Sequence, residues 1–243
     1  MTDLHRSDAV SANHIAESIA MANALSPDLM VFTGDYVTVS RPISNRYPRL
    51  ARLIQTLFKE SSPQAEMLHD CARCMSQARA KHGVFACLGN HDNWYDGDAV
   101  ARAIESAGIT VLRNANTVIR INGEPLAIVG IGDYWTEGAD IWRAFQGVDA
   151  PFSLALMHNP DSFEDWPRPG SHLILAGHTH GGQIVVPFLG PPVVPSRFGQ
   201  KYAHGLFARG DIHMFVNRGV GLIAPPVRFN CPPEIALLKL QKA

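Results

Sequence analysis

The sequence predicts a single mixed α/β domain, because short apolar strand candidates alternate with amphipathic helix candidates along the chain. The chain has 243 residues, of which 46% are hydrophobic and 18% are charged, which is ordinary for one large globular domain. The sequence contains no internal repeat, low-complexity tract or linker. We therefore expect one domain over residues 1–243, with a helical insertion over about residues 40–82.

The first half of the chain is predicted to alternate helices with short strands. The expected elements are a helix over residues 13–25, a strand over 28–33, two helices in the insertion, a strand over 83–88 and a helix over 98–107. Within the insertion, apolar residues recur at helical spacing from Leu50 to Phe58 and again from Met67 to Ala78. The two inserted helices could form a lid or pack as a layer on the sheet, and we favour the layer.

The second half is predicted to be mostly strands. The expected strands cover residues 109–112, 117–121, 126–131, 152–157, 172–176, 205–208, 212–216 and 235–240. Asn122 and Gly123 separate the second and third of these, and this dipeptide predicts a tight hairpin.

Charge and cysteine usage exclude several classes of function. The net charge is −1 and the basic residues are scattered, so the chain has no electrostatic footprint for nucleic acid. Cys71 and Cys74 form a C-x-x-C, but no second ligand pair accompanies them, so we interpret them as buried apolar residues. The chain shows neither a transmembrane run nor a signal pattern. We expect a cytoplasmic protein or one that lies peripherally at the cytoplasmic membrane.

Five short polar motifs lie at, or just past, the ends of expected strands. They are Asp3-Leu4-His5, Gly34-Asp35, Gly89-Asn90-His91-Asp92, His158 and Gly177-His178-Thr179-His180. Carboxyl ends of neighbouring strands converge on one crevice, so these side chains should meet. Carboxylates mixed with imidazoles suit manganese, zinc or iron better than magnesium or calcium. The motifs therefore predict two adjacent divalent ions, with manganese preferred, and such a pair implies hydrolysis of a phosphate ester.

The order D-x-H, G-D, G-N-H-D, H, G-H-x-H resembles that of the calcineurin-like metallophosphoesterases, from residue 3 to about residue 240. Residues 177–183 and the tail over 227–235 resemble a bacterial branch of phosphodiesterases that is similar to UDP-diacylglucosamine hydrolases. The resemblance implies a four-layer α-β-β-α sandwich of two mixed sheets. Only Met1 and Thr2 precede Asp3, so the first strand of that fold is missing or replaced and the first ion should bind weakly.

The resemblance also implies roles for individual residues. The implied ligands are Asp3, His5 and His180 for one ion, Asn90, His158 and His178 for the other, and Asp35 as a bridge. His91 would protonate the leaving oxygen or stabilise its charge, and Asp92 could orient the ring of His91. The implied reaction is phosphodiester hydrolysis by a hydroxide that bridges the two ions.

The remaining features concern the substrate. Residues 184–195 contain no polar side chain, so they could form an exposed apolar wall for a lipid-linked substrate or a membrane surface, or pack against the second sheet. Trp94 could line the pocket, and Arg218 and Arg228 could contact phosphate or form surface ion pairs. The expected partner is a small or lipid-linked phosphodiester.

Two alternatives stay open at this point. One is hydrolysis of a nucleotide-linked lipid pyrophosphate of the UDP-diacylglucosamine type. The other is a non-catalytic scaffold of the same fold. The scaffold is disfavoured because every implied ligand position is filled.

Overall fold

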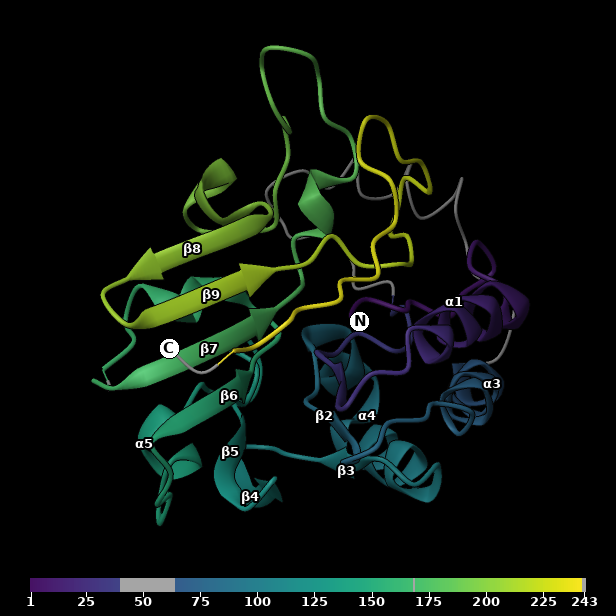
Figure 1. Cartoon of the computed structure of the whole chain (residues 1–243). Helices are drawn as coiled ribbons and strands as arrows, with labels where there is room; N and C mark the ends of the chain where they lie inside the picture. Colours follow the sequence, from purple (N-terminus) through teal and green to yellow (C-terminus); the bar gives the residue numbers. More distant parts are fainter. Residues whose placement is uncertain (40–63, 168, 242–243) are drawn as a thin grey trace.

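A computed structural model describes residues 1–39, 64–167 and 169–241, and two sheets form its centre (Figure 1). The smaller sheet is parallel and has the order β1 (Met30–Phe32), β2 (Val84–Ala86), β3 (Thr110–Val111). The larger sheet is mixed and has the order β4 (Ala115–Ile121), β5 (Glu124–Gly130), β6 (Phe152–Leu156), β7 (Ser171–Ala176), β9 (Ile212–Val216), β8 (Gly205–Arg209). Its four inner strands are parallel, and the two edge strands are antiparallel to their neighbours.

Helices form the two outer layers. The smaller sheet is covered by α1 (Ala12–Ala24), α3 (Gln64–Met75) and α4 (Asn90–Ser106), and the larger by α5 (Ile141–Ala144) with the 3₁₀ turns η1 (Pro160–Phe163) and η3 (Gly199–Tyr202) (Figure 1). Between the sheets, Phe85 and Leu112 pack against Ile128, Leu154 and Leu156. The expected four-layer α-β-β-α sandwich is therefore confirmed.

The amino-terminal residues 1–6 lie beside β1 and the residues that follow it. The backbone N–H of Asp3 donates to the carbonyl of Gly34, and that of His5 donates to the carbonyl of Asp35, both at 3.0 Å. On the other side, the N–H of Gly221 donates to the carbonyl of Asp3 at 2.7 Å. This short segment takes the place next to β1 where the sequence suggested a missing or replaced strand.

Most expected elements are present, and two differ from expectation. Helix α4 begins at Asn90 instead of residue 98, and a non-helical residue, Asp96, interrupts it. The strand expected over residues 235–240 is wrong, because that segment has no regular secondary structure. The hairpin at Asn122-Gly123 is confirmed, since both residues have positive φ and join β4 to β5.

The helical insertion is only partly described. The first inserted helix, expected from Leu50 to Phe58, lies outside the described residues. The second is α3, whose Cys71, Cys74 and Met75 are buried and which packs against α1 and α4. In the described ranges, α3 thus belongs to the outer layer. No helix in these ranges is both long enough and apolar enough to cross a membrane.

Candidate metal centre

The implied ligands come together at the carboxyl ends of strands from both sheets. Asp35 follows β1, Asn90 follows β2, His158 follows β6 and His178 follows β7. Asp3 and His5 come from the amino-terminal segment, and His180 opens η2 (His180–Gly182). All seven side chains are buried, with at most a few per cent of their surface exposed. Parallel strands of both sheets therefore deliver the predicted residues to one place.

The ligands form two clusters joined by one carboxylate. In the first, His180 Nε2 lies 3.3 Å from Asp3 Oδ1 and 3.1 Å from His5 Nε2. In the second, His158 Nε2 lies 3.1 Å from Asp35 Oδ2 and 3.2 Å from His178 Nδ1. Asp35 Oδ2 is also 3.4 Å from His5 Nε2, so this one oxygen faces both clusters.

The donor atoms of the site are better suited to binding a metal than to forming hydrogen bonds with one another. Two pairs of imidazole nitrogens face each other, and such a pair needs either an added proton or a cation between its two lone pairs. In the described part of the chain, Asn90 Oδ1, His178 Nε2 and His180 Nδ1 are buried without a hydrogen-bond partner. Buried polar atoms are normally satisfied, so three implied ligands that each keep an unsatisfied atom mark the site as one that could hold cations.

Five of the seven residues have a left-handed backbone. Asp3, His5, Asp35, His178 and His180 have φ between 47° and 71°. Residues other than glycine rarely adopt this region, and such strain concentrates at functional sites. The motif glycines permit the accompanying close approach, because a Cβ on Gly89 would overlap the Asp35 carboxylate. The motifs thus fix the shape of the backbone as well as the ligand types.

A second set of hydrogen bonds orients the histidine rings. His158 Nδ1 lies 2.7 Å from the carbonyl of Thr33, so Nδ1 carries a proton and Nε2 is the nitrogen directed toward the site. His5 Nδ1 lies 3.0 Å from Thr38 Oγ1. The sequence analysis did not assign a role to either threonine. Their only sequence signal is their place, within the predicted strand before Asp35 and three residues after it.

Burial and the two carboxylates set the protonation of the site without metal. Burial disfavours a charged ring, but Asp3 and Asp35 outweigh it and raise the pKa of His5 to about 9. Asp35 likewise raises the pKa of His158 to about 10 against the effect of burial. Burial and the charge of His158 lower the pKa of His178 to about 3. In the metal-free protein, protons on His5 and His158 therefore supply positive charge that metal ions would supply.

His91 lies at the rim of this centre and is half-buried. Its backbone N–H donates to Asp35 Oδ1 at 2.9 Å, and its Nδ1 accepts from the N–H of Val39 at 3.0 Å. A ring that accepts at Nδ1 carries its proton on Nε2 when neutral. Burial lowers the pKa of His91 to about 4, although Asp35 opposes the shift.

Asp92 has other partners than the sequence suggested. Its carboxylate accepts from the backbone N–H groups of Asp35, Tyr36 and Gly89, each at 2.8 Å. We expected Asp92 to orient the ring of His91, but the hydrogen bond to this ring comes from the backbone N–H of Val39. Asp92 instead holds the loop after β1 against the start of α4.

The two arginines singled out as phosphate contacts are engaged elsewhere. Arg228 donates to backbone carbonyls, among them those of His180 at 3.3 Å and Gly221 at 2.8 Å. Arg218 pairs with Glu234 at 3.1 Å, as the ion-pair alternative expected. Arg228 therefore fastens the carboxyl-terminal loop to the metal-binding loop, and a phosphate contact by this residue stays a prediction.

Two further residues near the centre were missed. Trp135 contacts His178 edge to face, with ring centroids 4.4 Å apart. Asp133 is fully buried, and burial raises the pKa of its carboxyl group, although the charge of His158 opposes the shift. Gly132-Asp133 follows β5 as Gly34-Asp35 follows β1, so the same strand-end signal could have found Asp133.

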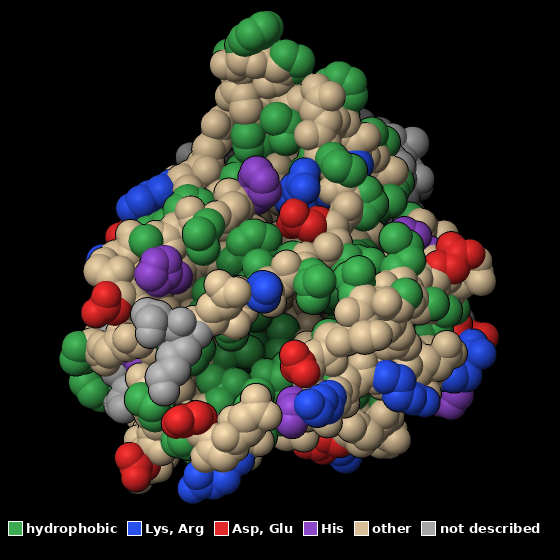
Figure 2. Space-filling view, in the orientation of Figure 1, with side chains coloured by type: hydrophobic (Ala, Val, Ile, Leu, Met, Phe, Trp, Pro, Cys, Tyr) green, Lys and Arg blue, Asp and Glu red, His purple; other side chains and the backbone are tan. Residues whose placement is uncertain are grey.

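The apolar segment over residues 184–195 projects from the molecule (Figure 1). Phe188 is fully exposed, and Leu189 and Val193 are 74% and 73% exposed. Figure 2 shows hydrophobic side chains at the outer end of this projection. These three side chains are therefore exposed and not packed against the second sheet, and a role of the segment as a wall for a lipid-linked substrate or a membrane surface stays a prediction.

Comparison with known proteins agrees with the site. The family profile described as calcineurin-like phosphoesterase matches residues 1–182. Phosphodiesterase YaeI of Escherichia coli is 35% identical over 243 residues, covering 99% of this chain and 80% of that protein. An uncharacterized metallophosphoesterase of Bacillus subtilis, YkuE, is 32% identical and is covered over 77% of its length. Sulfate thiohydrolase SoxB of Thermus thermophilus shares the fold, with a TM-score of 0.51 at 14% identity over 84% of this chain and 37% of its own.

The four-layer fold and its paired Asp/His clusters define a metal-dependent phosphoester hydrolase. This chain belongs to the calcineurin-like phosphoesterase family, as the resemblance in the motifs predicted. Membership implies divalent metal ions as cofactors, and two groups of buried side chains could hold them: Asp3, His5 and His180, and Asp35, His158 and His178.

Proposed function

We propose that this chain hydrolyses phosphodiesters with two divalent ions, manganese being the preferred metal. The observation that carries the proposal is the position of Asp35 Oδ2, 3.1 Å from His158 Nε2 and 3.4 Å from His5 Nε2. One carboxylate oxygen facing two ligand clusters suits a bridge between adjacent ions. The name of the Escherichia coli relative supports a diester as the substrate class.

The two divalent metal ions would supply an activated water and a clamp for the phosphoryl oxygens when bound. The rest of the chemistry belongs to the chain. Asp3, His5 and His180 would hold one ion, and Asn90, His158 and His178 the other, as the motifs predicted. His91 has Nε2–H free to donate when its ring is neutral, which would suit protonation of the leaving oxygen. Four imidazoles in the ligand set favour manganese, zinc or iron over magnesium.

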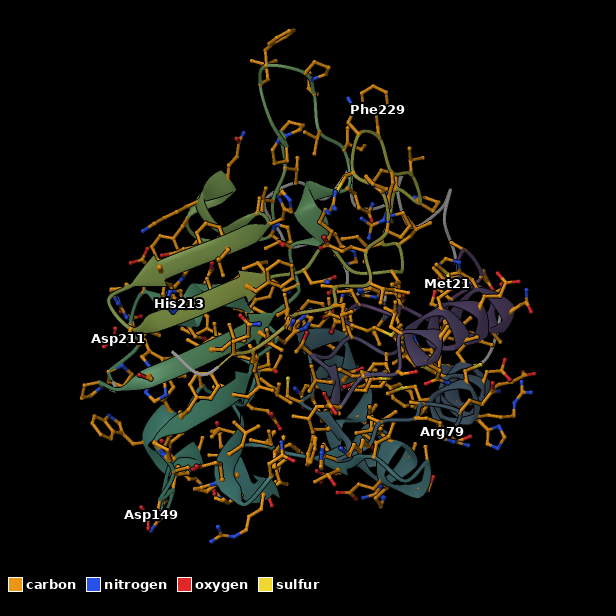
Figure 3. All side chains as sticks on the ribbon, viewed as in Figure 1. Met21, Arg79, Asp149, Asp211, His213 and Phe229 are labelled. Carbon is orange, nitrogen blue, oxygen red and sulfur yellow. The ribbon has the colours of Figure 1, made fainter. Side chains whose placement is uncertain are left out.

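Turnover of bis(4-nitrophenyl) phosphate tests this proposal. We expect manganese-dependent release of nitrophenol that a chelator abolishes, and slower cleavage of 4-nitrophenyl phosphate, the matching monoester. His178→Ala should lose activity together with metal, whereas His213→Ala, which alters an exposed histidine on β9 (Figure 3), should retain both. Absent turnover would favour the non-catalytic scaffold, and turnover that a chelator does not affect would contradict the metal dependence. Faster cleavage of the monoester would end the diesterase assignment.

We further propose that the projecting apolar segment contacts a membrane surface, so that the centre meets lipid-linked phosphodiesters or pyrophosphates. Residues 184–195 carry no charged side chain, and Phe229 lies at the end of the neighbouring loop (Figure 3). Gln200 donates to the carbonyls of Leu189 and Pro191 at 3.1 and 3.0 Å. Paired backbone groups and apolar side chains are what contact with the lipid interior requires.

Sedimentation with phospholipid vesicles tests this contact. The double variant Phe188→Asn, Leu189→Gln keeps a residue that tolerates the positive φ of position 188. We expect it to bind vesicles at least about tenfold more weakly, since burying one such side chain contributes about 1.5–3 kcal/mol. Met21→Gln alters an exposed methionine on α1, far from the projection in Figure 3, and should bind as the wild type does. Equal binding by all three proteins would exclude the contact.

A further inference from the structure

Four aromatic rings form a continuous line across the metal centre. His91 and Trp94 have ring centroids 4.8 Å apart, and Trp135 and His178 have theirs 4.4 Å apart. The two indoles stack on each other, with centroids 6.5 Å apart and planes within 19° of parallel. One tryptophan thus contacts the proposed proton donor, and the other contacts a proposed metal ligand.

The two indoles come from different layers of the fold. Trp94 lies in the first turns of α4, and Trp135 lies in the loop after β5. Trp94 is half-buried, and Trp135 is 42% exposed. Together they present an apolar aromatic surface that reaches solvent and extends from His91 to the proposed ligand His178. Ordinary core packing would have buried this surface.

The loop that carries Trp135 is held firmly. The backbone N–H of Trp135 donates to Asp133 Oδ2 at 3.0 Å, and the Thr136 hydroxyl donates to the same oxygen at 2.8 Å. The hydroxyl of Tyr134 accepts from Arg197 at 2.7 Å. The backbone that carries the indole is therefore anchored, and the ring itself contacts Trp94 and His178, so less freedom is lost when a ligand binds.

We propose that Trp94 and Trp135 form a stacking platform for a planar aromatic substituent of the phosphoester. This inference rests on the proposed function for the position of the phosphoryl group. A ring stacked on the platform would have its phosphate directed at the ligand clusters, because the platform ends on His91 and His178. Aromatic rings stack on indole whatever hydrogen-bonding groups they carry at their edges. The platform should therefore favour phosphoesters with any planar aromatic group.

Calorimetric titration of the manganese-loaded protein with two phosphonates tests the platform without requiring turnover. Phenylphosphonate and methylphosphonate share the metal-binding head and differ in the ring. We expect the wild type to bind phenylphosphonate about tenfold more tightly, which is the size of one ring stacking on an aromatic side chain. Trp135→Leu should abolish that preference and leave the affinity for methylphosphonate unchanged.

Trp142→Leu is the matched control, because Trp142 is 63% exposed but lies on α5 and is not part of the ring line. It should behave as the wild type does. Wild-type protein that does not prefer the phenyl compound, or does not bind it, would overturn the platform, as would a Trp135→Leu variant that keeps the preference. A variant that loses affinity for both phosphonates equally would show a structural role and would also overturn it. Absence of diester turnover would remove the proposed function alone, since the titration stands independently.

Discussion

At the scale of single residues, the tautomer of His91 determines what it can do. The N–H of Val39 donates to Nδ1, so the neutral ring offers Nε2–H and no lone pair toward the substrate. With its pKa lowered to about 4 by burial, the ring is neutral at pH 7. His91 therefore suits proton donation to a leaving alkoxide better than metal binding.

We expect His91→Ala to slow hydrolysis by about 10²–10⁴-fold for diesters with alkyl leaving groups, because these need a proton to depart. Diesters of 4-nitrophenol, which leaves as a stable anion, should lose far less. Metal content should not change, and atomic absorption on the purified variant checks it. Loss of metal would reassign His91 as a ligand, and equal losses for both leaving groups would remove its role as an acid.

The raised pKa values of His5 and His158 predict proton release when metal binds. Both values, about 9 and about 10, exceed 7, so both rings are protonated at pH 7 in the metal-free protein. Ligands must lose these protons to bind a cation, so affinity should rise with pH up to that range. Calorimetry at pH 7 in two buffers of different ionisation enthalpy should show about two protons released per chain when both ions bind, one from each cluster. No dependence on the buffer would contradict this protonation state.

At the scale of elements, the start of α4 carries both chemistry and structure. Gly89 is its N-cap, and the side chain of Asp92 in the first turn accepts from the backbone N–H of Gly89. The same carboxylate accepts from Asp35 and Tyr36, so it links the loop of the bridging ligand to this helix. The G-N-H-D motif is therefore a helix start, and the sequence predicted only the part of α4 that follows the kink at Asp96.

We expect Asp92→Ala to destabilise the metal-free protein by about 3 kcal/mol, because it leaves three buried N–H groups without an acceptor. Urea denaturation measures the change. Glu105→Ala on the exposed face of the same helix should stay within about 0.5 kcal/mol of the wild type. Equal stability of the two variants would show that the carboxylate does not support the loop.

The sequence predicted strands and their ends well, because apolar runs and terminal Gly-Asp or Gly-His signals are local. It did not predict the early start of α4, since residues 90–97 are mostly polar and show no apolar stripe. It wrongly placed a strand over 235–240, where apolar residues recur but the segment pairs with neither sheet in the described fold. Trp135 and Thr38 could not be found locally, because their partners lie far away in sequence.

At the scale of the whole molecule, the metal centre joins the two sheets. Asp35 and Asn90 follow strands of the smaller sheet, and His158 and His178 follow strands of the larger one. An ion bound by residues of both sheets stabilises the folded chain and not the unfolded one. Metal occupancy and the packing of the two sheets are therefore linked.

We expect manganese at about 100 times its dissociation constant to stabilise the protein by about 2.7 kcal/mol and to raise the melting temperature, and excess chelator to reverse the effect. Asp35→Asn should show a much smaller shift, because it weakens the ligand shared by both clusters. Differential scanning calorimetry on both proteins, with and without metal, makes the comparison. An equal shift in the variant would place the stabilising metal elsewhere.

The hydrogen-bonding distance between His5 and His180 has a kinetic consequence. These residues are separated by 175 positions in the chain, so their cluster exists only after both sheets have formed and the amino-terminal segment has docked. Contacts of such long sequence separation form late in folding. During refolding, the protein should therefore bind a coloured or paramagnetic divalent ion only after this docking step. The rate of metal uptake would then report the rate at which folding is completed.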